Sequence, residues 1–450
     1  MHSLRNEKIG KLLWEFSLPA IIGMLVNALY NIISRIFVGQ GIGYIAVAAV
    51  TVAFPIMTLL FAVAMLIGIG ATALISIRLG EKRLDEVEKI AGNALTLLIL
   101  LPLTLSLIYF AFSDPILMFF GAKNEVLPYA KDYISIIMLG SVFGSISFGL
   151  NNFIRAEGNP RIAMMTQIIG AVVNIILHYF FIFSFGWGIK GAAIATIISQ
   201  VVSASWVLSH FLLGRSRIKL KISNLKPQFP IVLRTLSIGF APFAMQIANS
   251  IQQTILNKNL MHYGGDLALA AAGIIMSVAM LLMMPIVGVS QGAQPIIGYN
   301  YGAGDLGRVK ETLRKAIMVG TAIATTGYII LWLFAEPIVG LFSKNDIALT
   351  ELTVPALLTF LALLPVVGFQ IIGANFFQAI GKPVQSTILS LSRQVLLFIP
   401  LLLILPRYFG IQGVWITAPI ADALAIMITA SFLFYELRRK PKQAIPLKAK

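Results

Sequence analysis

Four polar residues, Tyr30, Asn31, Ser34 and Arg35, stand near the end of an apolar stretch at residues 19–40 that is long enough to cross a bilayer. Polar side chains at membrane depth are costly unless they face protein or water. Their chemistry is hydrogen bonding and charge recognition. We therefore predict that they handle a solute or an ion that passes through the membrane.

A second polar pair, Asn174 and His178, lies in a later apolar stretch with i, i+4 spacing, which places both side chains on one helix face. If this face meets Tyr30, Asn31 and Ser34, the result is a polar pocket without fixed negative charge. A histidine can titrate between pH 5 and 8. His178 is therefore either the group that carries a coupling proton or a buried residue held by ordinary hydrogen bonds.

Arg35 allows two interpretations. Near the end of a membrane helix an arginine can extend its charge to the interface and act as an anchor. Alternatively, Arg35 supplies positive charge at the pocket mouth and favours anionic or zwitterionic cargo.

The second half of the chain carries amides in place of charges. Gln246, Asn249 and Gln253 follow i, i+3, i+7 and share one helix face. Amides can bind the polar parts of varied cargo, or they can join helices by hydrogen bonds. Further candidates of the same kind along the pathway are Asn152, Gln291, Gln294, Gln370 and Asn375.

Asp422 is the only carboxylate well inside a predicted span, and Arg393 approaches the same region from a neighbouring span. A lone charge at that depth is unfavourable, so we expect an ion pair or a water-bridged link. The alternative is that Asp422 binds the coupling ion.

The elements that position these residues follow from composition. The chain has 450 residues, of which 58% are hydrophobic and 12% charged, and a mean hydropathy of +0.89, which indicates a polytopic membrane protein. Its net charge of +16 comes from basic residues scattered between apolar runs, so we expect no nucleic-acid partner. The absence of cysteine excludes disulfides and thiolate chemistry. The first apolar run is expected to be an uncleaved helix.

Twelve apolar runs are long enough to span: 13–38, 45–77, 91–112, 128–153, 161–184, 191–213, 231–257, 268–299, 314–335, 350–377, 386–406 and 411–435. Most Lys and Arg residues fall on the side of the termini, which predicts cytoplasmic N- and C-termini in a cell (inner) membrane. The basic residues predicted on the other side are Arg35, Lys123, Lys131, Lys190, Lys258, Lys344 and Arg407. The charged connections at 80–89 and 302–315 are expected to form short interfacial helices.

The chain repeats itself after about 222 residues, so that Pro19 matches Pro242 and Gly70-Ala71 matches Gly292-Ala293. We predict an all-α polytopic membrane protein with 12 transmembrane helices in two pseudo-twofold-related six-helix lobes. The boundaries are 1–213 for the N-terminal lobe, 214–230 for a cytoplasmic linker, and 231–450 for the C-terminal lobe with its basic tail. Pro19 and Pro242 are expected to bend their helices.

Several stretches carry a family resemblance: YNIISRIFVGQG, NNFIRAEGNP, SQGAQPIIGYNYGAGD, GFQIIGANFFQAIGKP and FGIQGVW. The chain resembles the prokaryotic multidrug and toxic compound extrusion (MATE) transporters. The resemblance implies a secondary antiporter that exports organic, amphiphilic or cationic compounds in exchange for H⁺ or Na⁺ by alternating access. It also implies cation-binding acids where this chain has Ser34 and His178.

The alternative function is a flippase or exporter of a lipid-linked saccharide or another amphiphile. No P-loop, zinc motif or nucleophile–base set points to an enzyme or to a cofactor. We expect small organic substrates and membrane lipids as partners, and a monomer.

Overall fold

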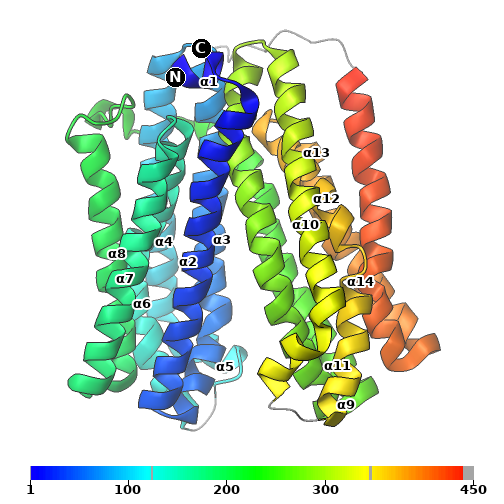
Figure 1. Ribbon diagram of the computed structural model, residues 1–450. Coiled ribbons are helices and arrows are strands. Elements are labelled where there is room, and N and C mark those ends of the chain that lie inside the picture. Colours follow the sequence, from blue (N-terminus) through cyan, green and yellow to red (C-terminus); the bar gives the residue numbers. More distant parts are fainter. Residues whose placement is uncertain (1, 123–124, 344–346, 439–450) are drawn as a thin grey trace.

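The structure is a computed structural model that describes residues 2–122, 125–343 and 347–438. Within these ranges it contains helices and no strand (Figure 1). In chain order the elements are α1 (His2–Asn6), α2 (Ile9–Gly41), α3 (Tyr44–Gly80), α4 (Leu84–Ala111), α5 (Ser113–Phe119), α6 (Val126–Ala156), α7 (Pro160–Tyr179), η1 (Phe180–Ser184), α8 (Gly188–Leu212), η2 (Ile222–Asn224), α9 (Phe229–Gly302), α10 (Leu306–Ser343), α11 (Ile347–Phe360), α12 (Leu364–Ala379), α13 (Pro383–Leu391), η3 (Ser392–Phe398) and α14 (Ile399–Arg438).

Helix α9 contains two membrane crossings, and the continuous run from α13 through η3 to the end of α14 contains two more. The chain reverses inside α9 at Gly265 (φ 63°, ψ −158°) and inside α14 at Gly410 (φ 56°, ψ −138°). Positive φ costs little only for glycine, which explains the residue type at both reversals. The pair α11 and α12 is one crossing bent by 46°. Counted this way, the described helices provide the twelve crossings that the sequence predicts.

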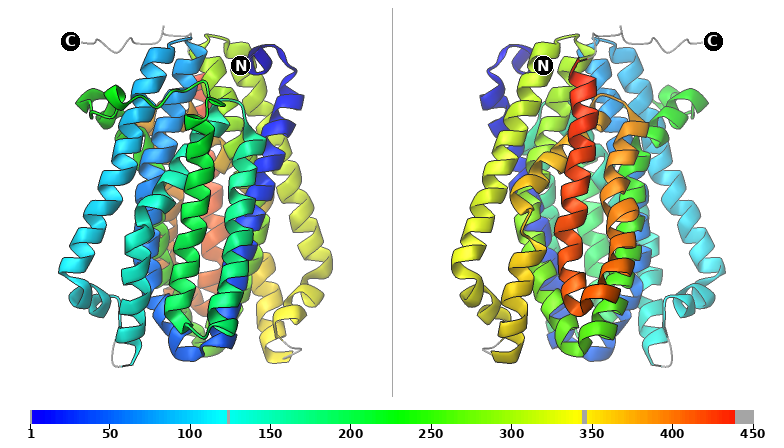
Figure 2. Two further views of the ribbon diagram at one scale, coloured as in Figure 1. Left: turned by 90° about the vertical axis from the view of Figure 1, so that its left-hand side faces the viewer. Right: turned by 90° about the vertical axis from the view of Figure 1, so that its right-hand side faces the viewer.

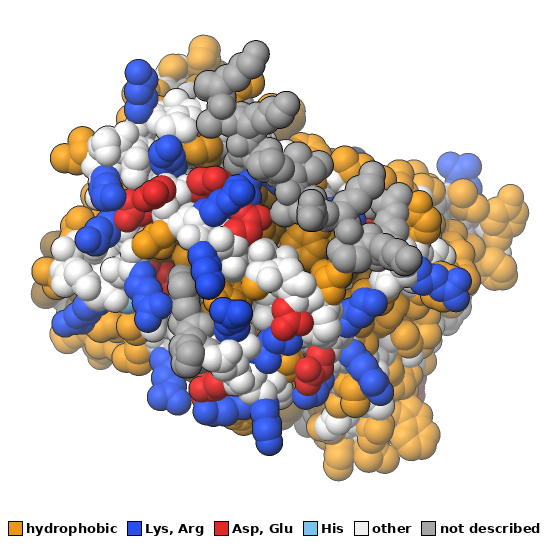
Figure 3. Space-filling view, turned by 90° about the horizontal axis from the view of Figure 1, so that it is seen from above, with side chains coloured by type: hydrophobic (Ala, Val, Ile, Leu, Met, Phe, Trp, Pro, Cys, Tyr) orange, Lys and Arg blue, Asp and Glu red, His pale blue; other side chains and the backbone are white. Residues whose placement is uncertain are grey.

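The helices form two lobes that stand side by side, α2–α8 in one and α9–α14 in the other (Figures 1 and 2). Helix α1 and the end of α14 lie at the same end of the molecule, which we call the termini end; the opposite end is the far end. Seen from above, the termini end carries many Lys and Arg side chains interspersed with acids (Figure 3). The basic tail at 439–450, Lys123 and Lys344 lie outside the described residues.

Among the described residues, the lobes share a hydrophobic core toward the termini end. There Ile238, Ile296 and Tyr299 of α9 join the N-lobe cluster around Ile67 and Leu74. Separate clusters fill the far part of the N-lobe and the interior of the C-lobe. Burial of this apolar surface against protein therefore joins the lobes at one end.

The linker between the lobes is fixed by a buried carboxylate. Glu157 Oε1 accepts hydrogen bonds from the backbone N–H of Ile218 (2.8 Å) and the hydroxyl of Ser216, and Glu157 Oε2 lies 3.1 Å from His210 Nε2. Helix α8 ends at Leu212 and α9 begins at Phe229, so the predicted linker 214–230 covers the connection between them, including η2, and the first two residues of α9. Further along the linker, the Glu88 carboxylate, 2.5 Å from Lys221 Nζ, raises the pKa of Lys221.

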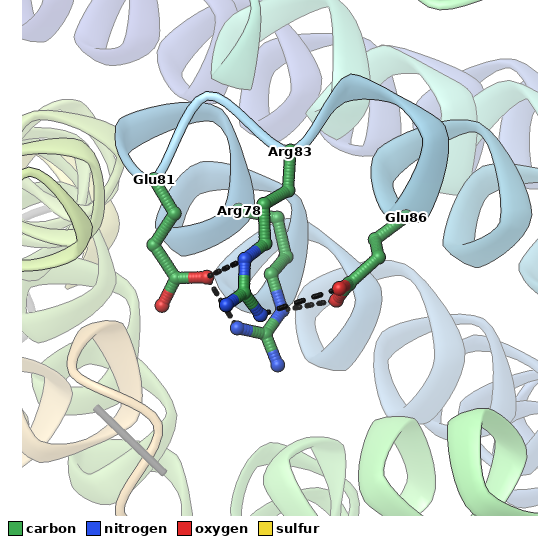
Figure 4. A network of polar contacts seen from close by, with 4 residues as sticks. All are labelled: Arg78, Glu81, Arg83 and Glu86. Carbon is green, nitrogen blue, oxygen red and sulfur yellow. Dashed lines mark hydrogen bonds and ion pairs between the residues drawn. The ribbon is translucent and has the colours of Figure 1, made fainter. Parts of the chain in front are cut away.

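The charged connections differ from the expectation of short interfacial helices. Helix α3 continues to Gly80 and α4 starts at Leu84, so the connection is a tight turn. Alternating charges hold this turn (Figure 4): Arg78 Nε lies 2.9 Å from Glu86 Oε2, and Arg83 Nη1 lies 3.3 Å from Glu86 Oε1. Arg78 also contacts Glu81. The repeat-related connection between α9 and α10 is equally short.

Candidate functional site between the lobes

The first polar cluster links α2, α7 and α8 by neutral hydrogen bonds. Ser34 Oγ donates to Asn174 Oδ1 (3.0 Å), and Asn174 Nδ2 donates to Ser199 Oγ (3.1 Å). Ser199 Oγ donates in turn to the carbonyl of Thr196 (2.7 Å). The predicted meeting of the Ser34 and Asn174 faces is therefore confirmed. These groups satisfy one another by hydrogen bonds, and the cluster itself contains no charged side chain.

His178 borders this cluster but is held by its own helix. Its ring is 2% exposed, and Nδ1 lies 3.0 Å from the carbonyl oxygen of Asn174. Helix α7 ends one residue later, and the chain passes into the π-helical turn η1. Such turns occur frequently at functional sites because they shift the helix register.

The central member of this cluster should be its most sensitive position. Replacing Asn174 with leucine, whose side chain has the same number and branching of heavy atoms, leaves Ser34 and Ser199 without this partner. We expect the free energy of unfolding to fall by about 1–3 kcal/mol. Thermal unfolding of purified wild type, Asn174→Leu and Ser34→Ala measures this loss of stability. Ser34→Ala should lose less stability than Asn174→Leu because it removes only one hydrogen bond. Equal stability of Asn174→Leu and wild type would contradict the network.

The two long helices that face each other across the lobes carry matching exposed polar ladders. In α2, Asn31 Nδ2 donates to the carbonyl oxygen of Asn27 (2.8 Å). In α9, Gln253 Nε2 donates to Asn257 Oδ1 (2.9 Å), and Asn249 contacts Gln246 (3.4 Å). With an offset of 222 residues, one fewer than the offset that matches Pro19 to Pro242, the repeat relates Asn27, Asn31 and Arg35 to Asn249, Gln253 and Asn257, respectively. We call these two sets of three the α2 ladder and the α9 ladder.

Each ladder lies on a different helix face from the exposed apolar residues. Leu29, Ile32 and Ile36 of α2 are 53%, 46% and 47% exposed. At about 100° per residue, Leu29 and Ile36 lie roughly opposite the centre of the α2 ladder, and Ile32 lies about a quarter turn away. Ile251 is likewise placed about half a turn from Asn249. Because exposed amides are disfavoured against lipid, the apolar faces suit lipid and the ladders suit an aqueous space.

In the C-lobe, a partly buried ion pair supports the α9 ladder. Asp422 of α14 accepts a hydrogen bond from Arg393 Nε of η3 at 2.6 Å, so the predicted pair is present. The residue next to Arg393, Gln394, donates to Asn249 Oδ1 at 2.6 Å. The π-helical segment η3 therefore connects Asp422 to the ladder.

Glycines close the space between the lobes toward the termini end. A Cβ built on Gly239 of α9 would lie 1.7 Å from the carbonyl oxygen of Leu66, and one on Gly70 of α3 would lie 2.1 Å from that of Thr235. A Cβ built on Gly80 or on Gly302 would lie 1.9 Å from a backbone carbonyl oxygen of the other lobe. The helices of the two lobes thus touch backbone to backbone, which only glycine permits.

Several predicted pathway amides belong to this closed region. Gln291 accepts a hydrogen bond from Arg155 of the other lobe (2.7 Å), and Asn375 donates to Ser290 (2.6 Å). Asn152 and Gln370 donate to the carbonyls of Phe148 (2.9 Å) and Leu389 (3.3 Å). Gln294 Nε2 is buried without a hydrogen-bond partner among the described residues. Gln291, Gln370 and Asn375 thus join helices here, whereas Asn152 bonds within its own helix α6. Gln246, Asn249 and Gln253 stay with the exposed face.

The remaining predicted residues have simple positions. Tyr30 is half-buried beside the α2 ladder, and Arg35 is exposed with its guanidinium carbon 5.5 Å from the centroid of the Phe54 ring. Pro19 and Pro242 lie buried inside α2 and α9, which continue through them. Asn27, Asn257, Gln394, Ser199 and Arg155 were not among the sequence candidates. The i, i+4 spacing of Asn27 to Asn31 and of Gln253 to Asn257 could have indicated two of them.

Two six-helix lobes with internal repeats, polar ladders and a closed end define a polytopic membrane transporter. The sequence model of the MatE family matches residues 19–180 and 242–404, once in each lobe and over more than half of the chain. The chain therefore belongs to the MatE family, whose members are transporters and not enzymes.

Individual relatives agree over nearly the full length. The chain is 29% identical to "Multidrug export protein MepA" of Staphylococcus aureus (strain N315), over 97% of this chain and 96% of that protein. A MATE crystal structure in complex with MaL6 has a TM-score of 0.92 at 26% identity and covers 97% of this chain and 98% of its own. The outward-facing conformation of a multidrug resistance MATE transporter has a TM-score of 0.91 at 26% identity, with 97% of both chains covered. These matches do not favour the flippase alternative.

Proposed function

We propose that this protein is a secondary antiporter that exports organic amphiphiles by alternating access, driven by H⁺ or Na⁺. One observation carries the proposal: the lobes are sealed by backbone contacts at the termini end, whereas the polar ladders nearer the far end stay exposed. A path closed at one end and lined by hydrogen-bonding groups suits a carrier that opens to each side in turn. The names and titles of its relatives, which are drug exporters, support the same substrate class.

The orientation follows from the charges. With the basic termini end in the cytoplasm of the cell membrane, the far end faces outward, and the structure corresponds to an outward-open state. One chain supplies both ladders and the seal, so we propose that the monomer is the transporting unit. Small organic compounds are its cargo, and membrane lipids surround it.

The test is uptake of an amphiphilic dye into proteoliposomes with an imposed pH or sodium gradient. Transport against the dye's concentration gradient should occur with at least one of these ion gradients and should stop when an ionophore collapses it. Equal dye movement with and without the ion gradients would overturn the proposal.

Coupling is expected to depend on His178 or Asp422, the titratable groups that lie beside the polar cluster and the α9 ladder. His178→Ala or Asp422→Asn should lower proton-driven uptake at least tenfold, because the variant then lacks a group that exchanges the proton. His262→Ala, which removes an exposed histidine, is the control and should retain wild-type uptake. If both variants transport as well as wild type under a pH gradient, neither group is the coupling site.

A further inference from the structure

The α2 ladder differs from the α9 ladder in one respect. Its third member is Arg35, whereas the repeat-related position in α9 is the neutral Asn257. The α9 ladder itself is therefore neutral, whereas the α2 ladder carries one positive charge; the exposed Lys258, next to Asn257, lies about 100° further round α9. The question is whether the charge of Arg35 faces the space between the lobes or the membrane interface.

Helix geometry places Arg35 toward the other lobe. Arg35 is 18 residues from Ser17, about five full turns, so the two side chains share one face of α2. Ser17 packs against the other lobe, because a Cβ on Gly292 would lie 2.6 Å from its hydroxyl. Asn257 likewise lies 18 residues after Gly239 and shares its face of α9, and Gly239 packs against Leu66 of the N-lobe. The two repeat-related positions therefore face each other across the space between the lobes.

The direction of the side chain argues against an anchor in the interface. Helix α2 runs from the termini end to the far end, so its Cα–Cβ bonds tilt back toward the termini end. The guanidinium carbon of Arg35 lies 5.5 Å from the centroid of the Phe54 ring, and Phe54 is ten residues inside the far end of α3. An arginine that extends to the far interface would point the other way.

Arg35 also has no carboxylate partner within ion-pair distance among the described residues. Near the far ends of α5 and α6, Asp114 is paired with Lys131 (2.8 Å) and Asp132 with Lys190 (3.3 Å), and Glu125, which precedes α6, is not within ion-pair distance of Arg35. Asp422 is paired with Arg393. Ser34, one residue before Arg35, belongs to a neutral cluster. The positive charge on this face of α2 is therefore not neutralised by the protein.

We propose that Arg35, lying over the 51% exposed ring of Phe54 and next to the α2 ladder amides, binds an anionic group of the transported amphiphile. A guanidinium presents N–H donors in a planar fork that matches a carboxylate, sulfonate or phosphate. The Phe54 ring covers one face of the guanidinium and offers apolar contact to the body of the cargo. Asn31 and, across the space, Asn257 can donate further hydrogen bonds to the anion.

This inference rests on the proposed function and adds a charge preference to it. Its test uses gradient-driven uptake of two dyes, anionic carboxyfluorescein and cationic ethidium, into proteoliposomes. Arg35→Asn copies the residue of the α9 ladder, and it should lower the ratio of carboxyfluorescein to ethidium uptake about tenfold, since it removes a charge-assisted hydrogen bond. Arg35→Lys should keep most of the ratio, and Asn257→Arg should raise it.

Arg407→Asn is the matched control, because Arg407 is an exposed arginine at the far end of the C-lobe outside both ladders. It should keep the wild-type ratio. An equal fall for both dyes in Arg35→Asn, or the same ratio in Arg35→Asn and wild type, would overturn the inference while leaving the antiporter proposal standing. Wild-type protein that moves neither dye under any gradient would overturn both.

Discussion

Replacing Gly239 with alanine should reduce transport more than any other single methyl group added to this protein. The new Cβ would lie 1.7 Å from the carbonyl oxygen of Leu66, where no side chain can move aside because the neighbour is backbone. The lobes must then separate at the termini end. We expect uptake to fall at least tenfold and the population of the sealed state to decrease.

The chain offers a matched control for this experiment. Gly273 lies in the same helix α9 and is exposed, and a Cβ there would meet nothing within 4 Å. Gly273→Ala should keep transport and raise stability slightly, by about 0.5–1 kcal/mol, from helix propensity alone. Because the protein has no cysteine, spin labels can be placed on Lys89→Cys of α4 and Arg314→Cys of α10 without background. The distance between them should increase in Gly239→Ala; an unchanged distance together with normal uptake would contradict the seal.

Breaking the Asp422–Arg393 pair should have the largest effect on stability. In Asp422→Ala the guanidinium of Arg393 loses its partner; this costs about 3–5 kcal/mol for a fully buried pair, and less here because the Arg393 side chain is 25% exposed. Removing both charges, with Arg393→Met and Asp422→Leu together, should recover most of this loss because no uncompensated charge remains.

Unfolding in detergent, followed by tryptophan fluorescence, distinguishes the single variant from the double variant. If the double variant is as unstable as Asp422→Ala, the pair is not the source of the stability. Asp422→Asn keeps an oxygen that can accept from Arg393, so its stability should lie between those of wild type and Asp422→Ala.

The sequence predicted the fold because membrane crossings depend on local composition. Apolar runs and the internal repeat located twelve spans, including the pairs merged inside α9 and in the run from α13 to α14. The connections at 80–89 and 302–315 were misjudged, since their mixed charges suggested separate helices. In the structure these charges instead hold the tight turn at Arg78–Glu86.

The candidate site was predictable where one physical rule decided the partner. Asp422 needed a cation at its depth, and Arg393 was the available one. Ser34 and Asn174 were expected to meet from their depth and helix face. The contact of Arg155 with Gln291 and the glycine seal were not predictable, because they depend on how one lobe docks on the other. Local sequence patterns do not predict how the two lobes dock.

The central claim is that the two polar ladders line an aqueous path between the lobes, and thiol accessibility measures this most directly. Single cysteines at Asn31 and Gln253 of the ladders can be compared with Ile32 and Ile251, which are exposed on the apolar faces of the same helices. We predict that a membrane-impermeant thiol reagent added at the far side labels Asn31→Cys and Gln253→Cys and leaves Ile32→Cys and Ile251→Cys unlabelled. Equal labelling of all four positions, or labelling of the isoleucine positions alone, would contradict the account.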